Sequence, residues 1–281
     1  MDTGRGAARR TEDDLGVAHT WGDGPEVVFL SNPLADPVAW SAAARGDLLR
    51  AGHRVTTFEH RPERDDWCSV VACVTTFVER REAPVALVGW SQGAVVAQEV
   101  ALAASDRVRA AVLFAPYGRQ NQIDVLLQEA WDDLLDHGTD GLRLVLNLLT
   151  AFPPEQLADD DFVARMRATQ RDWSGPPDPQ ARRRSAAFIA SYQDRLSHLA
   201  DVAVPCLVVG FELDTDTFAA RAREVADAIS GAEYLELPGL GHAAPATEPH
   251  QVWPPVLGFL GRHHPARRAA RPHASQSWTT A

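Results

Sequence analysis

A serine, a carboxylate and a histidine follow three separate apolar runs, in the order Ser91, Asp214 and His242. A histidine that accepts the proton of a serine hydroxyl turns that serine into a nucleophile, and a carboxylate orients the histidine. Taken singly, Asp214 could cap a helix and His242 could be an ordinary loop residue. Together, their order and their positions beyond apolar runs favour nucleophilic catalysis. Two neighbouring carboxylates, Glu212 and Asp216, could replace Asp214.

The stretch around Ser91 predicts a strand, a sharp turn and a helix. Residues 85–88 form an apolar run, and apolar residues recur at helical spacing over 94–104. In Gly-x-Ser-x-Gly, a strained turn exposes the serine Oγ above the sheet, and the glycines let strand and helix approach closely. The backbone N–H of Gln92, at the start of the helix, can then face a developing oxyanion. The alternative is an ordinary turn whose serine caps the helix.

The elements that must position these residues alternate between strand and helix. Strands are predicted at 17–21, 26–30, 53–59, 85–89, 108–114, 205–211 and 233–237, and helices at 38–51, 66–81, 94–104, 218–229 and 250–262. This alternation predicts a doubly wound, mostly parallel α/β sheet. Catalytic groups in such sheets gather beyond the carboxyl ends of the strands, where the three candidate residues fall.

The strand pattern stops between residues 117 and 200. Apolar residues there recur at helical spacing over 125–135, 142–149, 162–173 and 182–199. We therefore expect a helical lid at 117–200, inserted into an α/β core formed by 15–116 and 201–262. Residues 1–14 are rich in arginine, glycine and acidic residues with almost no apolar ones, and residues 263–281 are rich in proline, arginine and serine, so we expect both ends to be disordered tails.

Composition limits the classes of function. The net charge of −11 argues against general affinity for nucleic acid or anionic membranes. The chain contains no lysine, which excludes a Schiff-base lysine mechanism. Three cysteines without C-x-x-C spacing indicate neither a disulfide framework nor a zinc site, and we expect buried free thiols. An apolar leader and a transmembrane-length run are absent from the sequence, so we expect a cytoplasmic protein.

Several motifs together resemble the α/β-hydrolase fold superfamily over residues 16–262. They are Gly-Trp-Ser-Gln-Gly at 89–93, Phe-Glu-Leu-Asp at 211–214, Gly-His at 241–242 followed by Glu-Pro at 248–249, and Phe-Glu-His-Arg at 58–61 where the family usually has Tyr-Asp-x-Arg. The branch that the chain resembles holds 3-oxoadipate enol-lactonases, cofactor-free haloperoxidase-like esterases and antibiotic-pathway hydrolases. The resemblance implies a lid inserted after the sixth core strand and no cofactor or metal.

The same resemblance implies a role for each member of the triad. Ser91 corresponds to the nucleophile, and His242 corresponds to the general base that later acts as an acid. Asp214 holds the motif position of the carboxylate that orients the imidazole, so it is favoured over Glu212 and Asp216.

The loop that usually completes the oxyanion hole departs from the family pattern. The family has His-Gly-x or Ser-Asn-Ser-Leu-Gly there, whereas this chain has Ser-Asn-Pro-Leu-Ala at 31–35. A tryptophan common after that loop matches Trp40 and places Pro33 at the donor position, although proline has no N–H to donate. Either the N–H of Leu34 replaces it, or the reaction needs no complete oxyanion hole. A loop shifted by one residue is equally compatible with the sequence.

Aromatic and polar residues near the nucleophile and in the lid are candidates for substrate binding. They are Trp90, Asn32, Tyr117, Trp131 and Tyr192, although lid aromatics also form the lid's own core. We expect a small to medium, largely apolar small-molecule substrate, and a homodimer is compatible with the sequence.

Three hypotheses about function follow. The first is a serine hydrolase that cleaves an ester, lactone or thioester through an acyl-enzyme. The second, motivated by Pro33, is a tailoring enzyme of secondary metabolism that uses the triad for acid/base elimination, epimerisation or cyclisation. The third is a non-catalytic ligand-binding protein on the same scaffold.

Overall fold

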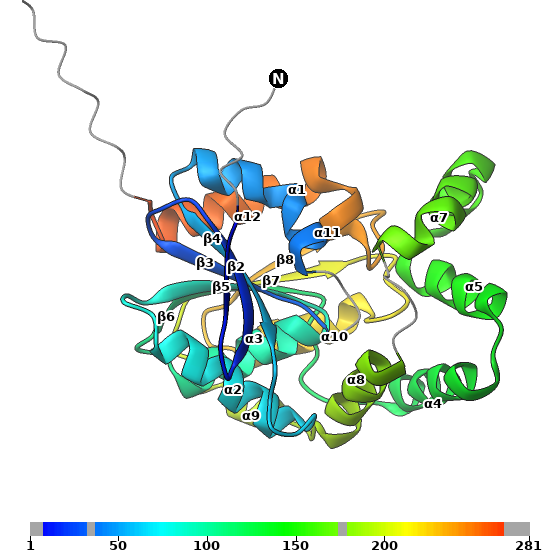
Figure 1. The fold of residues 1–281 in the computed structure, drawn as a ribbon, viewed down its shortest axis with the longest axis horizontal. Coiled ribbons are helices and arrows are strands. Elements are labelled where there is room, and N and C mark those ends of the chain that lie inside the picture. The colour runs from blue at the N-terminus through cyan, green and yellow to red at the C-terminus, as the bar shows by residue number, and fades with distance from the viewer. Residues whose placement is uncertain (1–7, 33–36, 174–178, 267–281) are drawn as a thin grey trace, which may run out of the picture.

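The computed structural model describes residues 8–32, 37–173 and 179–266, and an eight-stranded sheet lies at its centre (Figure 1). The strand order is β1-β2-β4-β3-β5-β6-β7-β8. The strands are β1 (Arg9–Glu12), β2 (Gly16–Trp21), β3 (Glu26–Leu30), β4 (Arg54–His60), β5 (Val85–Trp90), β6 (Val108–Phe114), β7 (Cys206–Phe211) and β8 (Glu233–Leu237). β2 runs antiparallel to β1 and β4, and the other neighbours are parallel, which confirms the mostly parallel sheet.

Helices cover both faces of the sheet (Figure 1). One face carries α1 (Pro37–Arg50), α11 (Ala244–Thr247) and α12 (Pro249–His263), and the other carries α2 (Trp67–Glu79), α3 (Gln92–Ala103) and α10 (Ala219–Ala228). Successive residues of β3 alternate between the two cores, with Val27 and Phe29 facing one and Val28 and Leu30 facing the other. The central strands are therefore apolar on both faces, as expected of a parallel sheet between two helical layers.

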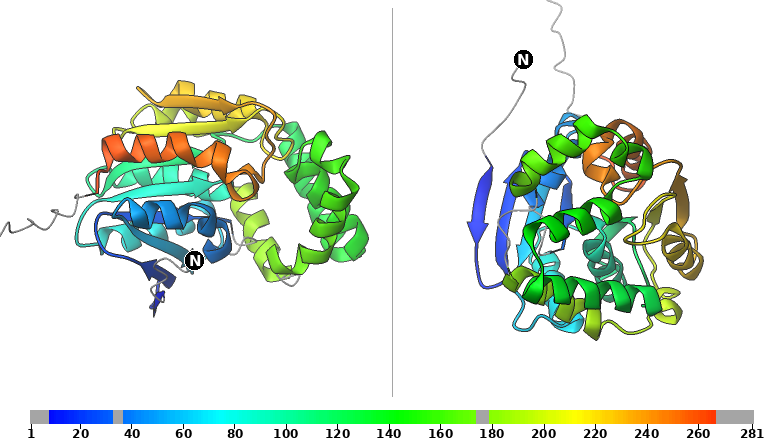
Figure 2. Two further views of the ribbon diagram at one scale, coloured as in Figure 1. Left: turned by 90° about the horizontal axis from the view of Figure 1, so that it is seen from above. Right: turned by 90° about the vertical axis from the view of Figure 1, so that its right-hand side faces the viewer.

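A helical insertion lies between β6 and β7, where the sequence predicts the lid. It contains α4 (Gln122–His137), α5 (Asp140–Ala151), α6 (Pro154–Leu157), α7 (Asp160–Trp173), α8 (Pro179–Ser191) and α9 (Leu196–Leu199). Figure 2 shows α4 to α8 beside the end of the sheet at which β5, β6 and β7 finish, whereas α9 contacts α3 and α10. This is the end of the sheet where the candidate catalytic residues follow their strands.

The prediction of continuous helical structure over 182–199 is wrong, because α8 ends at Ser191 and α9 begins at Leu196. The residues between them turn towards Glu99 of α3, which is 2% exposed. Its carboxylate accepts a hydrogen bond from the Tyr192 hydroxyl at 2.8 Å and pairs with the Arg195 guanidinium at 3.0 Å. A buried carboxylate is stable only with such partners, so this tertiary contact outweighs the helical pattern.

We expect Glu99→Ala to lower the free energy of unfolding by about 3–5 kcal/mol, because it leaves the largely buried Arg195 without its counter-charge. The control is Glu233→Ala, which removes an exposed pair with Arg262 and should cost about 0–1 kcal/mol. Urea unfolding followed by circular dichroism measures both. Equal losses in the two variants would contradict a structural role for the Glu99 contacts.

Both predicted tails need correction. Residues 9–12, expected to be disordered, form β1, which pairs with β2 and places Glu12 against Arg61 at 2.6 Å. Because β1 is an additional strand, residues 108–114 form the sixth strand in chain order, and the helical insertion follows it. At the other end α12 continues to His263, and the buried ring of His264 stacks on His53 with centroids 5.7 Å apart. Residues 1–7 and 267–281 lie outside the described part.

The three cysteines are free, but only two of them are buried. Cys73 lies on the face of α2 that packs on the sheet, and Cys206 begins β7. Cys68 is exposed, which corrects the expectation that all three thiols are buried, because its place on α2 lies off the packed face. None of the helices described in the chain has the length and apolar character needed to cross a membrane.

Candidate active site

Ser91 lies in a strained turn between β5 and α3. Its backbone has φ 56° and ψ −124°, a conformation that is unfavourable for a residue with a Cβ. Its N–H donates to the carbonyl oxygen of Phe114 at 2.9 Å, which ties the turn to β6. The Ser91 side chain makes no capping hydrogen bond to α3, so the alternative reading as a helix cap is wrong.

The two glycines of the motif are required by close backbone approaches. A Cβ at Gly89 would lie 2.3 Å from the carbonyl oxygen of Gly93. A Cβ at Gly93 would lie 2.2 Å from the carbonyl oxygen of Leu30, at the end of β3. Side chains at either position would push α3 away from the sheet and move Ser91 with it. The Gly-x-Ser-x-Gly spacing therefore follows from the packing of α3 on β3 and β5.

Asp214 and His242 form a buried pair in the loops after β7 and β8. The His242 Nδ1 lies 2.8 Å from Asp214 Oδ2, and the two residues are 8% and 2% exposed. The other oxygen of Asp214 accepts the backbone N–H groups of Asp216 at 2.9 Å and Thr217 at 2.8 Å. Both carboxylate oxygens are thus held in place, and the imidazole is oriented through Nδ1, as an acyl-transfer triad requires.

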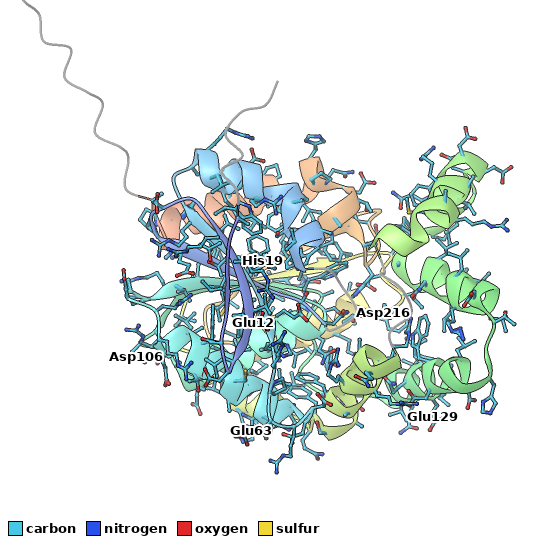
Figure 3. The ribbon with its side chains drawn as sticks, in the orientation of Figure 1. Glu12, His19, Glu63, Asp106, Glu129 and Asp216 are labelled. Atoms are coloured by element: carbon cyan, nitrogen blue, oxygen red, sulfur yellow. The ribbon has the colours of Figure 1, made fainter. Side chains whose placement is uncertain are left out.

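Of the other two candidate carboxylates, Glu212 lies away from the imidazole and Asp216 lies against it. Glu212 Oε2 accepts the backbone N–H of Gly239 at 2.8 Å near the surface. Asp216 Oδ2 is 3.3 Å from His242 Nε2, the ring atom opposite the one that contacts Asp214. Figure 3 shows Asp216 between the sheet and the helical insertion. The sequence names both carboxylates but cannot distinguish their positions.

The charges around His242 change its proton affinity. Burial by itself would lower the pKa of His242, but the negative charges of Asp214 and Asp216 outweigh it and raise the pKa to about 9. Burial raises the pKa of Asp216, an effect that the charge of His242 opposes.

Trp90 positions the loop that carries His242. Its indole N–H donates to the backbone carbonyl oxygen of His242 at 3.0 Å, and the two rings are 5.5 Å apart between centroids. On its other side, the Trp90 ring lies 5.8 Å from that of Trp40. The sequence predicts Trp90 only as a substrate contact and does not predict that its indole N–H holds the His242 loop.

The lid aromatics proposed as substrate contacts fall into different environments. Tyr192 is 3% exposed and its hydroxyl donates a hydrogen bond to Glu99, so it is a core residue and the prediction that it contacts substrate is wrong. The ring of Trp131 lies under the Arg182 guanidinium, 4.3 Å from its centroid. The buried hydroxyl of Tyr117 finds no hydrogen-bond partner among the described residues, and burial raises its pKa. Tyr117 therefore remains a candidate for substrate binding.

The oxyanion residues are only partly within the described structure. Gln92 begins α3 directly after Ser91, as predicted. Asn32 is half-buried beyond the end of β3, whereas Pro33 and Leu34 lie outside the described residues. The choice between the donors proposed for this loop therefore remains a prediction.

Sequence similarity agrees with this geometry. A profile of the alpha/beta hydrolase family matches residues 15–254. The chain belongs to the alpha/beta hydrolase family. Within that family, it is 30% identical over 250 residues to a Mycobacterium tuberculosis protein that carries the provisional name non-heme bromoperoxidase BpoC, covering 85% of this chain and 95% of the relative.

Solved structures of other alpha/beta hydrolases superpose on the chain. The crystal structure of BpoC from Mycobacterium tuberculosis H37Rv has a TM-score of 0.81 at 28% identity, covering 90% of this chain and 97% of the other. An enol-lactonase from Burkholderia xenovorans LB400 has a TM-score of 0.74 at 20% identity, covering 90% and 99%. At that identity the enol-lactonase shows a shared fold alone, as the sequence motifs predict.

One contact at the candidate site is not predicted from the sequence. Ser185 of α8 donates its hydroxyl hydrogen to Gln92 Oε1 at 2.9 Å, and both residues are buried. The contact ties the helical insertion to the residue that follows Ser91. Ser185 follows three arginines, a pattern typical of a solvated helix face, so the sequence holds no signal for this role.

Proposed function

We propose that this alpha/beta hydrolase is a serine hydrolase that cleaves an ester, lactone or thioester bond of a small to medium, largely apolar substrate through an acyl-enzyme. The observation that carries the proposal is the strained turn at Ser91 together with the buried Asp214–His242 pair. Strain of this kind at a non-glycine residue persists where the surrounding structure enforces it, and it is typical of functional sites.

The proposed reaction has two halves. In the first, neutral His242 takes the Ser91 hydroxyl proton at Nε2 while Oγ attacks the substrate carbonyl, and the backbone N–H of Gln92 donates to the oxyanion. The leaving group takes the proton from Nε2 as its bond to the carbonyl carbon breaks. In the second half a water molecule, deprotonated by the same nitrogen, attacks the acyl-enzyme, and Nε2 returns the proton to Ser91 Oγ as the acyl bond breaks and the acid is released. Asp214 stabilises the imidazolium in both halves.

A second candidate activity rests on the name of the mycobacterial relatives, which describes a bromoperoxidase. Hydrogen peroxide is a stronger nucleophile than water and can replace it in the second half-reaction. The released peracid can oxidise bromide. We therefore expect any bromination of an indicator dye to need both peroxide and a carboxylic acyl donor, and to disappear with the Ser91 hydroxyl.

The decisive experiment uses a fluorophosphonate probe and p-nitrophenyl butyrate in heavy-oxygen water. We expect one equivalent of probe on Ser91, multiple turnovers, and one labelled oxygen in the butyrate produced. Failure of the probe to label Ser91 would contradict the acyl-enzyme. A folded chain that neither cleaves the ester nor is labelled at Ser91 would favour the acid/base tailoring reaction, and binding of the ester without turnover would indicate the ligand-binding alternative.

A further inference from the structure

The imidazole of His242 has a carboxylate against each of its nitrogens. Asp214 Oδ2 is 2.8 Å from Nδ1, and Asp216 Oδ2 is 3.3 Å from Nε2. In a serine–histidine–aspartate triad the first contact orients the ring, whereas the second nitrogen must be free to accept the serine proton. Asp216 therefore lies where it can compete with Ser91 for the reactive atom.

The surroundings offer the Asp216 carboxylate little other compensation. Within the described part of the chain, His242 is the only cation in contact with it. The nearby charges of Asp214 and of Asp124 on α4 are also negative. Arg221 of α10 lies 3.9 Å from Asp124 and pairs with Glu224 at 3.1 Å.

Two other groups at this end of the sheet complete the electrostatic environment. The hydroxyl of Tyr117, after β6, is neutral and experiences the charges of Asp124 and Asp216. The Trp90 ring lies 5.5 Å from the imidazole and carries no charge. A buried imidazole between two carboxylates, with no competing cation against it among the residues that the structure describes, is therefore more stable with both nitrogens protonated.

We propose that Asp216 is a positioning residue that holds His242 in its protonated form in the free enzyme, so that the proton on Nε2 must leave before His242 can act as a base. This inference rests on the proposed hydrolase function and adds a control of the same site. The proton passes from Nε2 to solvent as the pH rises. The neutral nitrogen then accepts the hydroxyl proton of Ser91.

The proposal predicts an alkaline pH profile. With the pKa of His242 raised to about 9, about one molecule in a hundred carries a neutral imidazole at pH 7. We expect kcat/KM for p-nitrophenyl butyrate to rise about tenfold per pH unit and to level off near pH 9. Removing the negative charge of Asp216 lowers the pKa of His242 and makes the base available at a lower pH.

The test compares Asp216→Asn with Glu212→Gln, a matched loss of a carboxylate on the other side of Asp214. The His242 pKa is measured by nitrogen-15 NMR of the ring nitrogens, independently of any substrate. For Asp216→Asn we expect the His242 pKa to fall by about one to three units and the activity at pH 7 to rise by about tenfold to at most about 100-fold, with little change above pH 9. Glu212→Gln should leave the His242 pKa and the pH profile unchanged.

An unchanged His242 pKa in a folded Asp216→Asn variant would overturn the proposal, and so would an equal shift in Glu212→Gln. If Asp216→Asn fails to fold, Asp216→Ser removes the same charge with less bulk and is held to the same result. A lowered His242 pKa without ester turnover in any variant would support the role of Asp216 and refute the proposed hydrolase function. The two failures are thus distinguishable.

Discussion

Ser91→Ala is expected to reduce kcat for p-nitrophenyl butyrate on the order of 10⁶-fold, because the acyl-enzyme can no longer form. The strained turn presents the Ser91 side chain beyond β5, next to the loops that carry Asp214 and His242. Steady-state kinetics at pH 9, with the fluorophosphonate probe as an independent measure of the nucleophile, would establish the loss. Labelling of the variant should be undetectable.

Ser69→Ala is the matched control, since it removes a serine hydroxyl from the first turn of α2, where that hydroxyl donates to Asp66 and not to a candidate catalytic residue. Its activity and labelling should equal those of the unmodified chain. Ser91→Ala must also keep the native circular dichroism spectrum, because the loss is meant to be chemical. Turnover within tenfold of the unmodified chain in a folded Ser91→Ala protein would eliminate the acyl-enzyme mechanism.

The candidate set of Ser91, Asp214 and His242 could be selected from the sequence because its signals are local and ordered. Gly89 and Gly93 are required because an added Cβ would lie 2.3 Å and 2.2 Å from backbone carbonyl oxygens, and both flank Ser91, so the motif is visible in a short stretch. Asp214 and His242 follow strands whose apolar runs are also local. Parallel strands bring their carboxyl ends to one edge of the sheet, and chain order then gives the site.

The features that the sequence did not predict depend on contacts between distant residues. The contact of Asp216 with Nε2 depends on how the loop after β7 folds over His242, and residue spacing does not determine this. The break after α8 depends on Glu99, more than ninety residues earlier in the chain. β1 is stabilised by pairing with β2 and by charge pairs such as Glu12–Arg61, although its own residues carry no apolar pattern.

Aromatic residues were the least reliable predictions of function, for a physical reason. A large apolar ring is equally suited to a substrate pocket and to the core of an insertion. Tyr192 belongs to the core, because its ring packs on Phe188 and its hydroxyl is bonded to Glu99. Trp90 also holds the His242 loop through its indole N–H, a role that depends on how the ends of β5 and β8 lie relative to each other.

Asp214→Asn is expected to lower kcat on the order of 10⁴-fold, through the position of the imidazole proton. Asp214 accepts a hydrogen bond from Nδ1–H and so leaves Nε2 to receive the serine proton. An asparagine can instead donate its amide hydrogen to Nδ1. The remaining proton then stays on Nε2, where the Asp216 carboxylate 3.3 Å away favours it. The ring is held in the tautomer that cannot act as a base towards Ser91.

The contact of Asp216 with His242 allows a second test of the Asp214→Asn prediction. If it stabilises the wrong tautomer, adding Asp216→Asn to Asp214→Asn should recover part of the lost activity, whereas adding Glu212→Gln should recover none. Glu212 is bonded to the N–H of Gly239 and does not contact the imidazole, so Glu212→Gln alone should remain near full activity. Kinetics of the three single and two double variants at pH 7 and pH 9 measure these couplings. A larger loss in Glu212→Gln than in Asp214→Asn would show that Glu212, and not Asp214, serves as the acid of the triad.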